Sequence, residues 1–252
     1  MKWSMYAQYL RESIKGFNLF VNGVSIIVPV FNEKGSLEEL YRRTTLTLKS
    51  LEYIRNHEII FIDDCSTDSS LKTLKGISDR DNKCKVCRHL RRSGQGGAFK
   101  TGFDNASFDV CVTIDADLQV LPEDIPRIME HIEKYDLVNA RRIKRKDHFV
   151  TVFSSKVYNF MMKKILKSPL NDSASNYTAV KTRYVKGLSL QKNDHRYIIP
   201  IVMRRGATRF KEVDVNHFSR LKGKSKYSIF KAWTGFFEFF EFRRRLIRGL
   251  YN

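Results

Sequence analysis

Residues 24–33 read VSIIVPVFNE, an almost entirely apolar run that ends abruptly in polar side chains. Short continuous apolar runs of this kind are typical of strands buried on both faces of a parallel sheet. The pattern recurs at 58–64 (EIIFIDD) and at 110–117 (VCVTIDAD). The recurrence predicts a buried sheet whose strands lead directly into polar clusters.

Stretches with helical patterns separate these runs. We predict helices over 36–51, 66–77 and 97–106 and from 122 to about 133, and further strands over 85–90 and 137–140. Strands that alternate with helices are the signature of βαβ units. The fold class is therefore predicted to be α/β, with a Rossmann-like, mostly parallel sheet flanked by helices. In such sheets functional residues lie at the carboxyl ends of strands, so the clusters at 31–33, 63–64, 91–94 and 115–117 should converge.

The second half of the chain is less regular. It predicts a basic loop at 141–150, a helix at 153–166, a strand at 211–215 and a helix at 227–247, whereas 169–179 and 197–205 show no clear pattern. We expect an amphipathic extension over 1–22, one compact domain over 23–220, and a basic, aromatic segment over 221–252.

Charge is distributed unevenly between the two halves. Residues 1–140 hold 19 basic and 20 acidic side chains, whereas 141–252 hold 27 basic and 7 acidic ones. Such an excess indicates a polyanion, a phosphate-rich ligand or an anionic membrane surface as the partner of the second half. A nucleic-acid-binding protein is the rival of a different class, but no helix-turn-helix, zinc-finger or RNP pattern supports it. We therefore expect no nucleic acid partner.

The cysteines and the lengths of the apolar runs indicate where in the cell the protein is expected. The four cysteines, of which Cys84 and Cys87 form a lone CxxC, complete no zinc motif and are expected to be free thiols. No apolar run reaches the roughly 18–20 residues that span a bilayer, and the N-terminus lacks a signal-peptide stretch. We expect a peripheral protein at the cytoplasmic face of a membrane, or an anchored one if the natural chain is longer.

Two acidic pairs follow predicted strands. Asp115 and Asp117 alternate at the end of one strand and so point to the same side, with Gln119 two residues further. Two carboxylates and an amide oxygen form an incomplete shell suited to Mg²⁺ or Mn²⁺; the alternative is a carboxylate pair that caps the next helix. In the other pair, Asp64 (or Ser66) is expected to cap a helix, which leaves Asp63 to accept hydrogen bonds from a nucleotide.

Five stretches taken together carry a family resemblance: VSIIVPVFNE, FIDDCSTDSS, the basic Gly-rich RRSGQGG leading into GFDNA, TIDADLQ, and EVDVNHFSRLKGKSKY. They resemble the family 2 glycosyltransferases of GT-A fold, and within these the dolichol-phosphate mannosyltransferases and bacterial polyprenyl-phosphate glycosyltransferases. The resemblance covers about residues 24–245, so that 23–220 would be the glycosyltransferase domain. It implies a GDP- or UDP-sugar donor, Mg²⁺ or Mn²⁺, and inverting transfer to a dolichyl or undecaprenyl phosphate.

The resemblance also implies site residues by position. The nucleotide-sugar pocket would be lined by Pro29, Phe31, Glu33, Asp63, Asp64, Gly94 and Asp115. Asp117 and Gln119 would hold the metal, and the catalytic group would comprise Asp115, Asp117, Arg141 and Asp172. The acceptor phosphate would be met by Arg220, Lys224, Ser225 and Lys226.

The C-terminal helix carries an aromatic stripe. Phe230, Trp233, Phe237 and Phe240 recur at helical spacing, and arginines follow at 243–245 and 248. This combination favours an interfacial helix on anionic lipid, with Trp233 in the bilayer surface. Packing of the same stripe on the domain or on a second subunit is the alternative, and a homodimer or tetramer is left open.

Two acceptor chemistries remain. A phosphate acceptor is mostly dianionic at pH 7 and already nucleophilic, so its main requirement is neutralisation by cations. The alternative is a saccharide hydroxyl in surface-polysaccharide or lipopolysaccharide assembly, for which a carboxylate base such as Asp172 would be essential.

Overall fold

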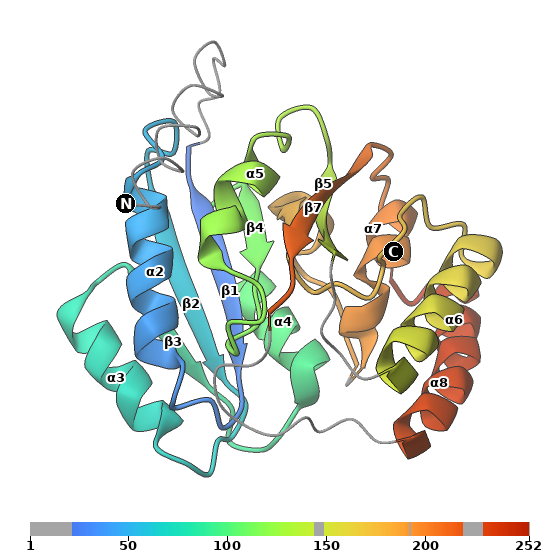
Figure 1. Ribbon diagram of the computed structural model, residues 1–252, viewed down its shortest axis with the longest axis horizontal. Helices are drawn as coiled ribbons and strands as arrows, with labels where there is room; N and C mark the ends of the chain where they lie inside the picture. The colour runs from blue at the N-terminus through green and yellow to red at the C-terminus, as the bar shows by residue number, and fades with distance from the viewer. Residues whose placement is uncertain (1–21, 144–148, 192, 219–228, 252) are drawn as a thin grey trace.

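The computed structural model describes residues 22–143, 149–191, 193–218 and 229–251, and within the helices it leaves the side chains of 149–154, 229–234 and 236 undescribed. The described part forms one seven-stranded sheet in the order β3-β2-β1-β4-β6-β5-β7 (Figure 1). The predicted extension over 1–22 lies outside the described residues, apart from Asn22. The strands are β1 Val24–Val30, β2 His57–Asp63, β3 Cys84–Arg88, β4 Val110–Thr113, β5 Leu137–Ile143, β6 Thr178–Lys181 and β7 Phe210–Asn216.

The sheet is mostly parallel, which confirms the predicted fold class. Only β6 runs antiparallel to its two neighbours, β4 and β5, among the described pairs. The α-helices are α2 Leu37–Lys49, α3 Ser70–Arg80, α4 Gly94–Asp104, α5 Ile125–Met129, α6 Phe149–Ile165, α7 Ile198–Arg204 and α8 Ile229–Ile247. Short 3₁₀ turns are η1 Pro122–Asp124, η2 Thr182–Tyr184 and η3 Asp194–Tyr197.

Each face of the sheet has its own core. Val24, Ile26 and Val28 of β1 pack with side chains of α2, α3 and α5, whereas Ile27 faces the opposite core, formed with α4, α6, α7 and α8. Because successive strand residues point to opposite faces, a strand covered on both sides must be apolar throughout. The run 24–30 therefore indicates an interior strand of the sheet, and β1 lies between β2 and β4.

The helix α2 shows why these residues cover the sheet. Its buried residues include Leu37, Leu40 and Leu48, which recur at helical spacing. Glu38 and Glu39 lie in the first turn, where carboxylates interact favourably with the helix dipole. The helix thus buries one apolar stripe in the core on this face of the sheet.

The second half differs from the predicted pattern in three places. The strand β6 and the helix α7 occupy stretches that showed no pattern, because four and seven residues are too few for a periodicity to be recognised. The strand β5 continues through Arg141 and Arg142 to Ile143, where a basic loop was predicted. It continues because β7 pairs with it along this whole length.

At the C-terminus, α8 lies beside α6 on the face of the sheet that carries α7 (Figure 1). Phe239 and Phe242 of α8 are buried, and the ring of Phe242 stacks on Tyr197 with centroids 4.0 Å apart. Arg245 forms a bidentate ion pair with buried Asp194. Part of the aromatic helix therefore packs on the domain. Among the described helices, none has the length and apolar character needed to cross a bilayer.

Candidate functional site

The polar clusters at the strand ends converge as the sequence predicts. Val30 at the end of β1 pairs in register with Asp63 at the end of β2. The amide of Asp64 donates to the carbonyl of Val30 at 2.9 Å. On the other side of β1, β4 ends beside it and leads into Asp115. The carboxyl ends of the central strands therefore form one polar edge.

The loops after β1 and β2 are fastened to each other by Asn32. Its side-chain Oδ1 accepts a hydrogen bond from the backbone N–H of Thr67 at 2.8 Å. Its backbone N–H donates to Ser66 Oγ at 3.0 Å. Asn32 adopts a left-handed backbone (φ 58°), which asparagine tolerates better than most residues. Since Ser66 is used in this contact and α3 begins only at Ser70, the predicted capping by Ser66 is wrong.

Asp63 presents a buried acceptor to this edge. Its side chain is almost fully buried, and Oδ2 accepts a long hydrogen bond of 3.4 Å from the amide of Ser66. Its Oδ1 has no hydrogen-bond partner within the described part of the chain. A buried carboxylate oxygen without a donor is costly. The geometry therefore suits an external N–H or O–H donor, such as a nucleotide base or ribose.

Asp64 has a different role from its neighbour. Its carboxylate accepts from the amides of Ser93 at 2.7 Å and Gly94 at 2.9 Å, and it contacts His89 Nδ1 at 2.9 Å. Gly94 itself has a φ of 76° and opens α4. Asp64 therefore fixes the Gly-rich loop at the N-terminus of α4 and does not cap α3. Its predicted direct contact with the donor stays a prediction.

The other predicted nucleotide residues lie around Asp63. Pro29 is half-buried within β1, opposite Ile62 of β2. Phe31 and Glu33 are partly exposed just beyond β1, and the guanidinium of Arg92 lies 3.8 Å from the centroid of the Phe31 ring. This brings a cation from the Gly-rich loop to the rim of the site, in agreement with the predicted convergence of the clusters at 31–33 and 91–94.

Asp115 is held by two amides that the sequence analysis missed. Gln95 Nε2, in the first turn of α4, donates to Oδ1 at 2.6 Å, and Asn176 Nδ2 donates to Oδ2 at 3.4 Å. Side-chain amide donors fix the orientation of a carboxylate. Neither residue has a periodic or spacing signal, and the only indication for Gln95 was its place in the Gly-rich stretch RRSGQGG.

Asp117 and Gln119 form the candidate metal position. Asp117 is buried, and its Oδ1 accepts from the amide of Gln119 at 3.1 Å. The turn between them passes through Leu118, whose φ is 58°. Gln119 Nε2 donates to the carbonyl of Phe218 at 3.3 Å, which leaves the amide oxygen as the acceptor end of that side chain. Carboxylate and amide oxygens are the donors that Mg²⁺ and Mn²⁺ prefer.

The protein itself offers few metal ligands at this position. Within the described residues, no group of three or more His, Cys, Asp or Glu side chains is placed to hold a metal ion. A hard cation at Asp117 would therefore need further oxygens from water or from a phosphate-bearing ligand. The residues present fit a divalent cation that is shared with a ligand.

The predicted loop over 141–150 places Arg141 after the fifth strand, and this position is wrong. It lies within β5, and its guanidinium makes two hydrogen bonds to Asp214 of β7, at 2.6 and 2.9 Å. This hydrogen-bonded pairing lowers the pKa of Asp214 and raises that of Arg141. In this structure Arg141 serves the pairing of β5 with β7.

Asp172 is likewise paired. Arg142 Nε and Nη2 donate to its two carboxylate oxygens, each at 2.9 Å, and the Arg142 amide donates to one of them at 3.1 Å. Both side chains are largely buried. Because a positive partner stabilises the carboxylate form, Asp172 is a poor proton acceptor in this arrangement. The structure shows Asp172 fastening the loop that leads to β6 to Arg142, and its predicted catalytic role stays a prediction.

The predicted acceptor residues cannot be placed. Arg220, Lys224, Ser225 and Lys226 lie outside the described residues, as does the side chain of Trp233. Their predicted roles stay predictions. The segment that carries them follows β7 and Phe218, whose contact with Gln119 brings the chain to the candidate metal position just before the described range ends.

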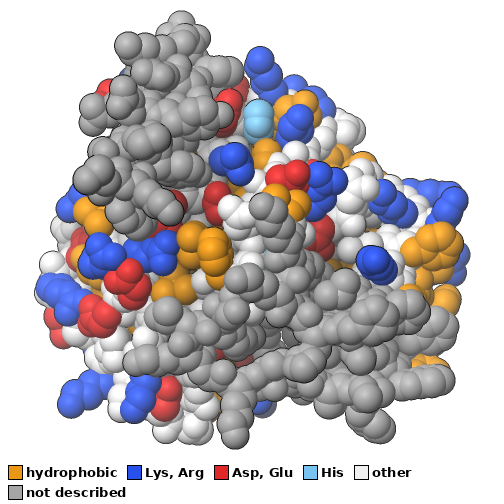
Figure 2. All heavy atoms as spheres, viewed as in Figure 1, with side chains coloured by type: hydrophobic (Ala, Val, Ile, Leu, Met, Phe, Trp, Pro, Cys, Tyr) orange, Lys and Arg blue, Asp and Glu red, His pale blue; other side chains and the backbone are white. Residues whose placement is uncertain are grey.

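An exposed apolar surface covers α6 and α8. It comprises Val157, Phe160 and Ile165 of α6 and Phe237, Phe240 and Ile247 of α8, with Leu250 just beyond. Exposed basic residues surround them, namely Lys156, Lys163, Lys164, Arg243, Arg244 and Arg248. Figure 2 shows hydrophobic side chains among Lys and Arg at the edge of the molecule where α6 lies. We call this set the α6/α8 surface.

The polar edge of a mostly parallel sheet, with one antiparallel strand inserted, defines a GT-A-like class of protein. A model of the family described as Glycosyl transferase family 2 matches residues 25–188. The chain belongs to this family. The resemblance stated from the sequence is thereby confirmed at the level of the family.

Two curated relatives are similar over most of this chain. The undecaprenyl-phosphate 4-deoxy-4-formamido-L-arabinose transferase of Proteus mirabilis (strain HI4320) is 36% identical over 213 residues, which cover 84% of this chain and 64% of that protein. The protein of the same name from Serratia proteamaculans (strain 568) is 34% identical with the same coverage. The match thus spans less than two thirds of the length of these relatives.

A solved structure shares the fold. Glucosyl-3-phosphoglycerate synthase from Mycobacterium tuberculosis, in complex with Mn²⁺, uridine diphosphate and glucosyl-3-phosphoglycerate, superposes with a TM-score of 0.63 at 16% identity. The superposition covers 86% of this chain and 77% of that one. It confirms the GT-A-like architecture.

Proposed function

We propose that this chain transfers a sugar from a nucleoside-diphosphate sugar to a polyprenyl phosphate, with Mg²⁺ or Mn²⁺ as cofactor. One observation carries the proposal. The central strand ends of a family 2 glycosyltransferase place buried Asp63, which has a carboxylate oxygen without a donor, on the same polar edge as Asp115 and Asp117. The named relatives, which are undecaprenyl-phosphate sugar transferases, support the acceptor.

In this proposal the donor lies along the polar edge. Asp63 accepts a hydrogen bond from the base or ribose, and the loop fixed by Asp64 presents the N-terminus of α4 to the diphosphate. Asp117 and Gln119 Oε1 would hold the metal together with diphosphate oxygens. When bound, the metal would stabilise the negative charge that develops on the departing nucleoside diphosphate.

The acceptor phosphate needs cations more than a base. Donor diphosphate and acceptor phosphate are both anions, and at ~4 Å in an effective dielectric of ~20 each pair of unit charges repels by about 4 kcal/mol. The second half of the chain, with 27 basic and 7 acidic side chains, supplies the compensating charge. We assign this role to Arg220, Lys224 and Lys226 because they follow the segment that contacts Gln119.

The state of Asp172 favours phosphate over a hydroxyl acceptor. A hydroxyl nucleophile requires a general base, and the carboxylate proposed for that task is bound bidentately by Arg142. A phosphate dianion attacks without such help. The α6/α8 surface, which combines exposed Phe with Lys and Arg, suits contact with an anionic bilayer, where a polyprenyl acceptor resides.

A transfer assay tests the proposal. Undecaprenyl phosphate and undecaprenol are offered in detergent with Mn²⁺ and each of four donors: UDP-glucose, UDP-N-acetylglucosamine, GDP-mannose and the UDP derivative of 4-deoxy-4-formamido-L-arabinose. We expect a glycosylated lipid from the phosphate and none from the alcohol, with loss of product in EDTA.

Lys224→Glu with Lys226→Glu should raise the KM of the lipid more than that of the donor. Transfer to the alcohol would contradict the phosphate acceptor, and equal changes in both KM values would contradict the assigned basic residues.

A further inference from the structure

Three polar side chains, Asp64, His89 and Thr101, form a connected row that joins the ends of β2 and β3 to helix α4. His89 Nδ1 lies 2.9 Å from Asp64 Oδ1, and His89 Nε2 lies 2.9 Å from Thr101 Oγ1. The backbone N–H of His89 donates to the carbonyl of Asp63 at 2.9 Å, which fixes the imidazole directly after β3. Because the side chains of His89 and Asp64 are only 14% and 6% exposed, solvent screens their contact weakly.

The carboxylate of Asp64 lies at the N-terminus of α4. It accepts from the backbone N–H groups of Ser93 at 2.7 Å and Gly94 at 2.9 Å. These belong to the set of N–H groups that a helix N-terminus offers to an anion. A diphosphate that approaches the same terminus is repelled by the negative charge of Asp64. A group that cancels this charge therefore strengthens the binding of the diphosphate.

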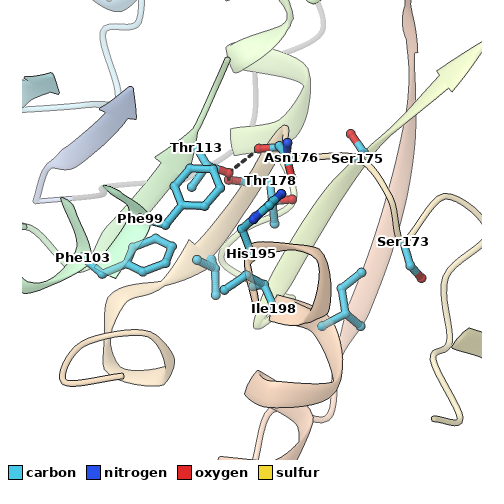
Figure 3. A pocket seen from close by; sticks show the side chains of 11 residues that line it. Phe99, Phe103, Thr113, Ser173, Ser175, Asn176, Thr178, His195 and Ile198 are labelled. Atoms are coloured by element: carbon cyan, nitrogen blue, oxygen red, sulfur yellow. Dashed lines mark hydrogen bonds between the residues drawn. The ribbon is translucent and has the colours of Figure 1, made fainter. Parts of the chain in front are cut away.

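The packing of α4 does not depend on this row of polar side chains. Phe99 and Phe103 are buried on the side of α4 that faces η3, where the Phe99 ring lies 6.2 Å from the imidazole of His195 (Figure 3). Thr101 lies two residues from each of them, about 200° around the helix. The phenylalanines thus fix α4 against η3, while Thr101 reaches His89 from a different side of the helix.

The hydroxyl of Thr101 accommodates both charge states of His89. A carboxylate only accepts hydrogen bonds, so Nδ1 carries a hydrogen in the contact with Asp64. In the neutral ring Nε2 accepts from the Thr101 hydroxyl, and in the imidazolium Nε2–H donates to the same oxygen. Histidine is the side chain type whose charge ordinarily changes between pH 5 and 8. His89 can therefore gain a proton without losing either contact.

The charged neighbours of His89 come from the loop after β2, the Gly-rich segment and α4. Arg92 Nε lies 4.0 Å from Asp64 Oδ2, on a side chain that is 59% exposed, and Lys100 pairs with Asp104 at 2.6 Å. Asp64 is the charged side chain in direct contact with the imidazole. The titratable or charged side chains of these elements and of β3 next to His89 are Asp63, Asp64, Cys65, Asp68, Cys87, Arg88, Arg91, Arg92, Lys100 and Asp104.

We propose that His89 is a positioning residue that takes up a proton when the donor binds. The imidazolium cancels the charge of Asp64 and leaves its carboxylate on the Gly-rich loop, so the diphosphate meets a neutral pair at the start of α4. Since binding favours the protonated ring, donor affinity rises as pH falls. The inference rests on the proposed function, because it takes the diphosphate to lie at the N-terminus of α4.

Calorimetric titration measures the proton directly. The four donors of the transfer assay are titrated with Mg²⁺; their diphosphate is esterified at both ends and does not itself titrate between pH 6 and 8. For the donor that binds, we expect about fivefold tighter binding at pH 6 than at pH 8. At pH 7 the binding enthalpy should differ between PIPES and imidazole buffers by an amount that corresponds to net proton uptake.

A variant that keeps the hydrogen bond but cannot be protonated tests the role of His89. His89→Asn places an amide N–H near the position of Nδ1–H, so affinity at pH 8 should stay within about threefold of wild type. Affinity should then be the same at pH 6 and pH 8, and proton uptake should be lost. His131→Asn is the control, at a histidine that follows α5 and contacts Tyr135, and it should keep the pH dependence of the wild type.

A matched pair at Thr101 provides a second test, which also serves if His89→Asn does not fold. Thr101→Ser keeps the hydroxyl and should take up the proton as the wild type does. Thr101→Val has the same shape as threonine but leaves the Nε2–H of the imidazolium without an acceptor, so proton uptake at pH 7 should fall by at least half.

The outcomes separate the two proposals. Absence of binding by all four donors would contradict the proposed function itself. Donor binding without proton uptake would overturn the role of His89 alone. Uptake that persists in His89→Asn, that is equal in Thr101→Val and Thr101→Ser, or that is lost in His131→Asn would also overturn it, because the proton would then not be bound at this contact.

Discussion

The aspartates at the strand ends of the half built on β1–β4 and three aspartates of the half built on β5–β7 and α8 are held in different ways. In the first half, Asp64 accepts from two backbone amides and contacts an imidazole, with Arg92 Nε at 4.0 Å, Asp115 accepts from two side-chain amides, and Asp63 has an oxygen without a donor in the described part of the chain. In the second half, Asp172, Asp194 and Asp214 each form a bidentate pair with an arginine.

We propose that this difference distinguishes acids that bind a ligand from acids that stabilise the fold. A neutral donor orients a carboxylate and leaves its charge for a metal or a ligand, whereas an arginine cancels that charge. The half with balanced composition thus presents acidic groups at its strand ends. In the basic half three of the seven acidic residues form bidentate pairs with arginines, and the sequence carries a surplus of cations, which suits the anionic acceptor that we propose.

The largest expected effect comes from removing the negative charge of Asp115 in the first half. Asp115→Asn keeps the shape of the side chain and removes its charge, and kcat/KM for transfer should fall by about 10³-fold. Asp79→Asn, at an exposed position on α3, is the control and should have no effect. Transfer by Asp115→Asn within about tenfold of wild type would remove this residue from the catalytic group.

The second prediction concerns the buried pair of the basic half. Asp172→Asn leaves Arg142 without its buried partner and should lower the free energy of unfolding by about 3 kcal/mol. Activity per folded molecule should stay within about threefold of wild type, because the role is positional. Urea unfolding and kcat at saturating substrate measure the two effects.

The ion pair between Asp214 and Arg141, which is more exposed to solvent, serves as the control for the buried pair. Asp214→Asn breaks the more exposed pair with Arg141 and should cost less than about 1 kcal/mol. If instead Asp172→Asn abolished turnover in a protein of normal stability, Asp172 would be a base. The hydroxyl-acceptor alternative would then gain support.

The third prediction uses pH. Burial raises the pKa of Asp124 to about 6, and Arg127 offsets this only in part. Its neighbouring cations are engaged elsewhere, since Arg43 pairs with Glu123 and Arg127 donates to the carbonyl of Asp214. A carboxyl whose pKa is raised on folding destabilises the protein as pH rises from about 4 to 6, and the full penalty remains above that range.

Asp124→Asn should therefore stabilise the protein at pH 7.5, by up to about 3 kcal/mol. The difference from wild type should disappear near pH 4, where the carboxyl is protonated in the folded state. Thermal or urea unfolding across this range measures it. A difference that does not change with pH would show that Asp124 titrates normally.

The smallest expected effect concerns the α6/α8 surface. Phe237→Glu places a charge at a side chain that is 70% exposed, so the fold should be unaffected while the fraction bound to phosphatidylglycerol-containing vesicles falls several-fold. Leu46→Glu, at a 56% exposed position on α2, is the control and should bind like wild type. Equal binding by both variants would contradict a membrane role for this surface.

The strand ends could be predicted from sequence because they are local features. The apolar runs at β1, β2 and β4 mark strands covered on both faces, and the polar residues that follow them must lie at one edge. The four residues of β6 carry no such pattern. Their position as the antiparallel strand between β4 and β5 depends on pairing with residues about 40 to 70 positions away.

The roles of paired residues could not be predicted for the same reason. Asp172 resembles an acceptor-side carboxylate in its sequence context, and only the pairing of β5 with its neighbours brings Arg142 to it. Gln95 and Asn176 hold Asp115 from two separate segments, so no spacing connects them. A sequence motif can nominate a carboxylate, but its charge state depends on partners that the fold supplies.

The central claim is that the first-half edge binds a nucleotide together with a divalent cation. Calorimetric titration of UDP and GDP, with and without Mn²⁺, into the wild type, Asp117→Ala and Asp79→Ala tests it most directly. We expect one nucleotide to bind in a metal-dependent manner to the wild type and to Asp79→Ala, and at least tenfold more weakly to Asp117→Ala. Binding that is unaffected by Asp117→Ala or by removal of Mn²⁺, or no binding of either nucleotide, would contradict the claim.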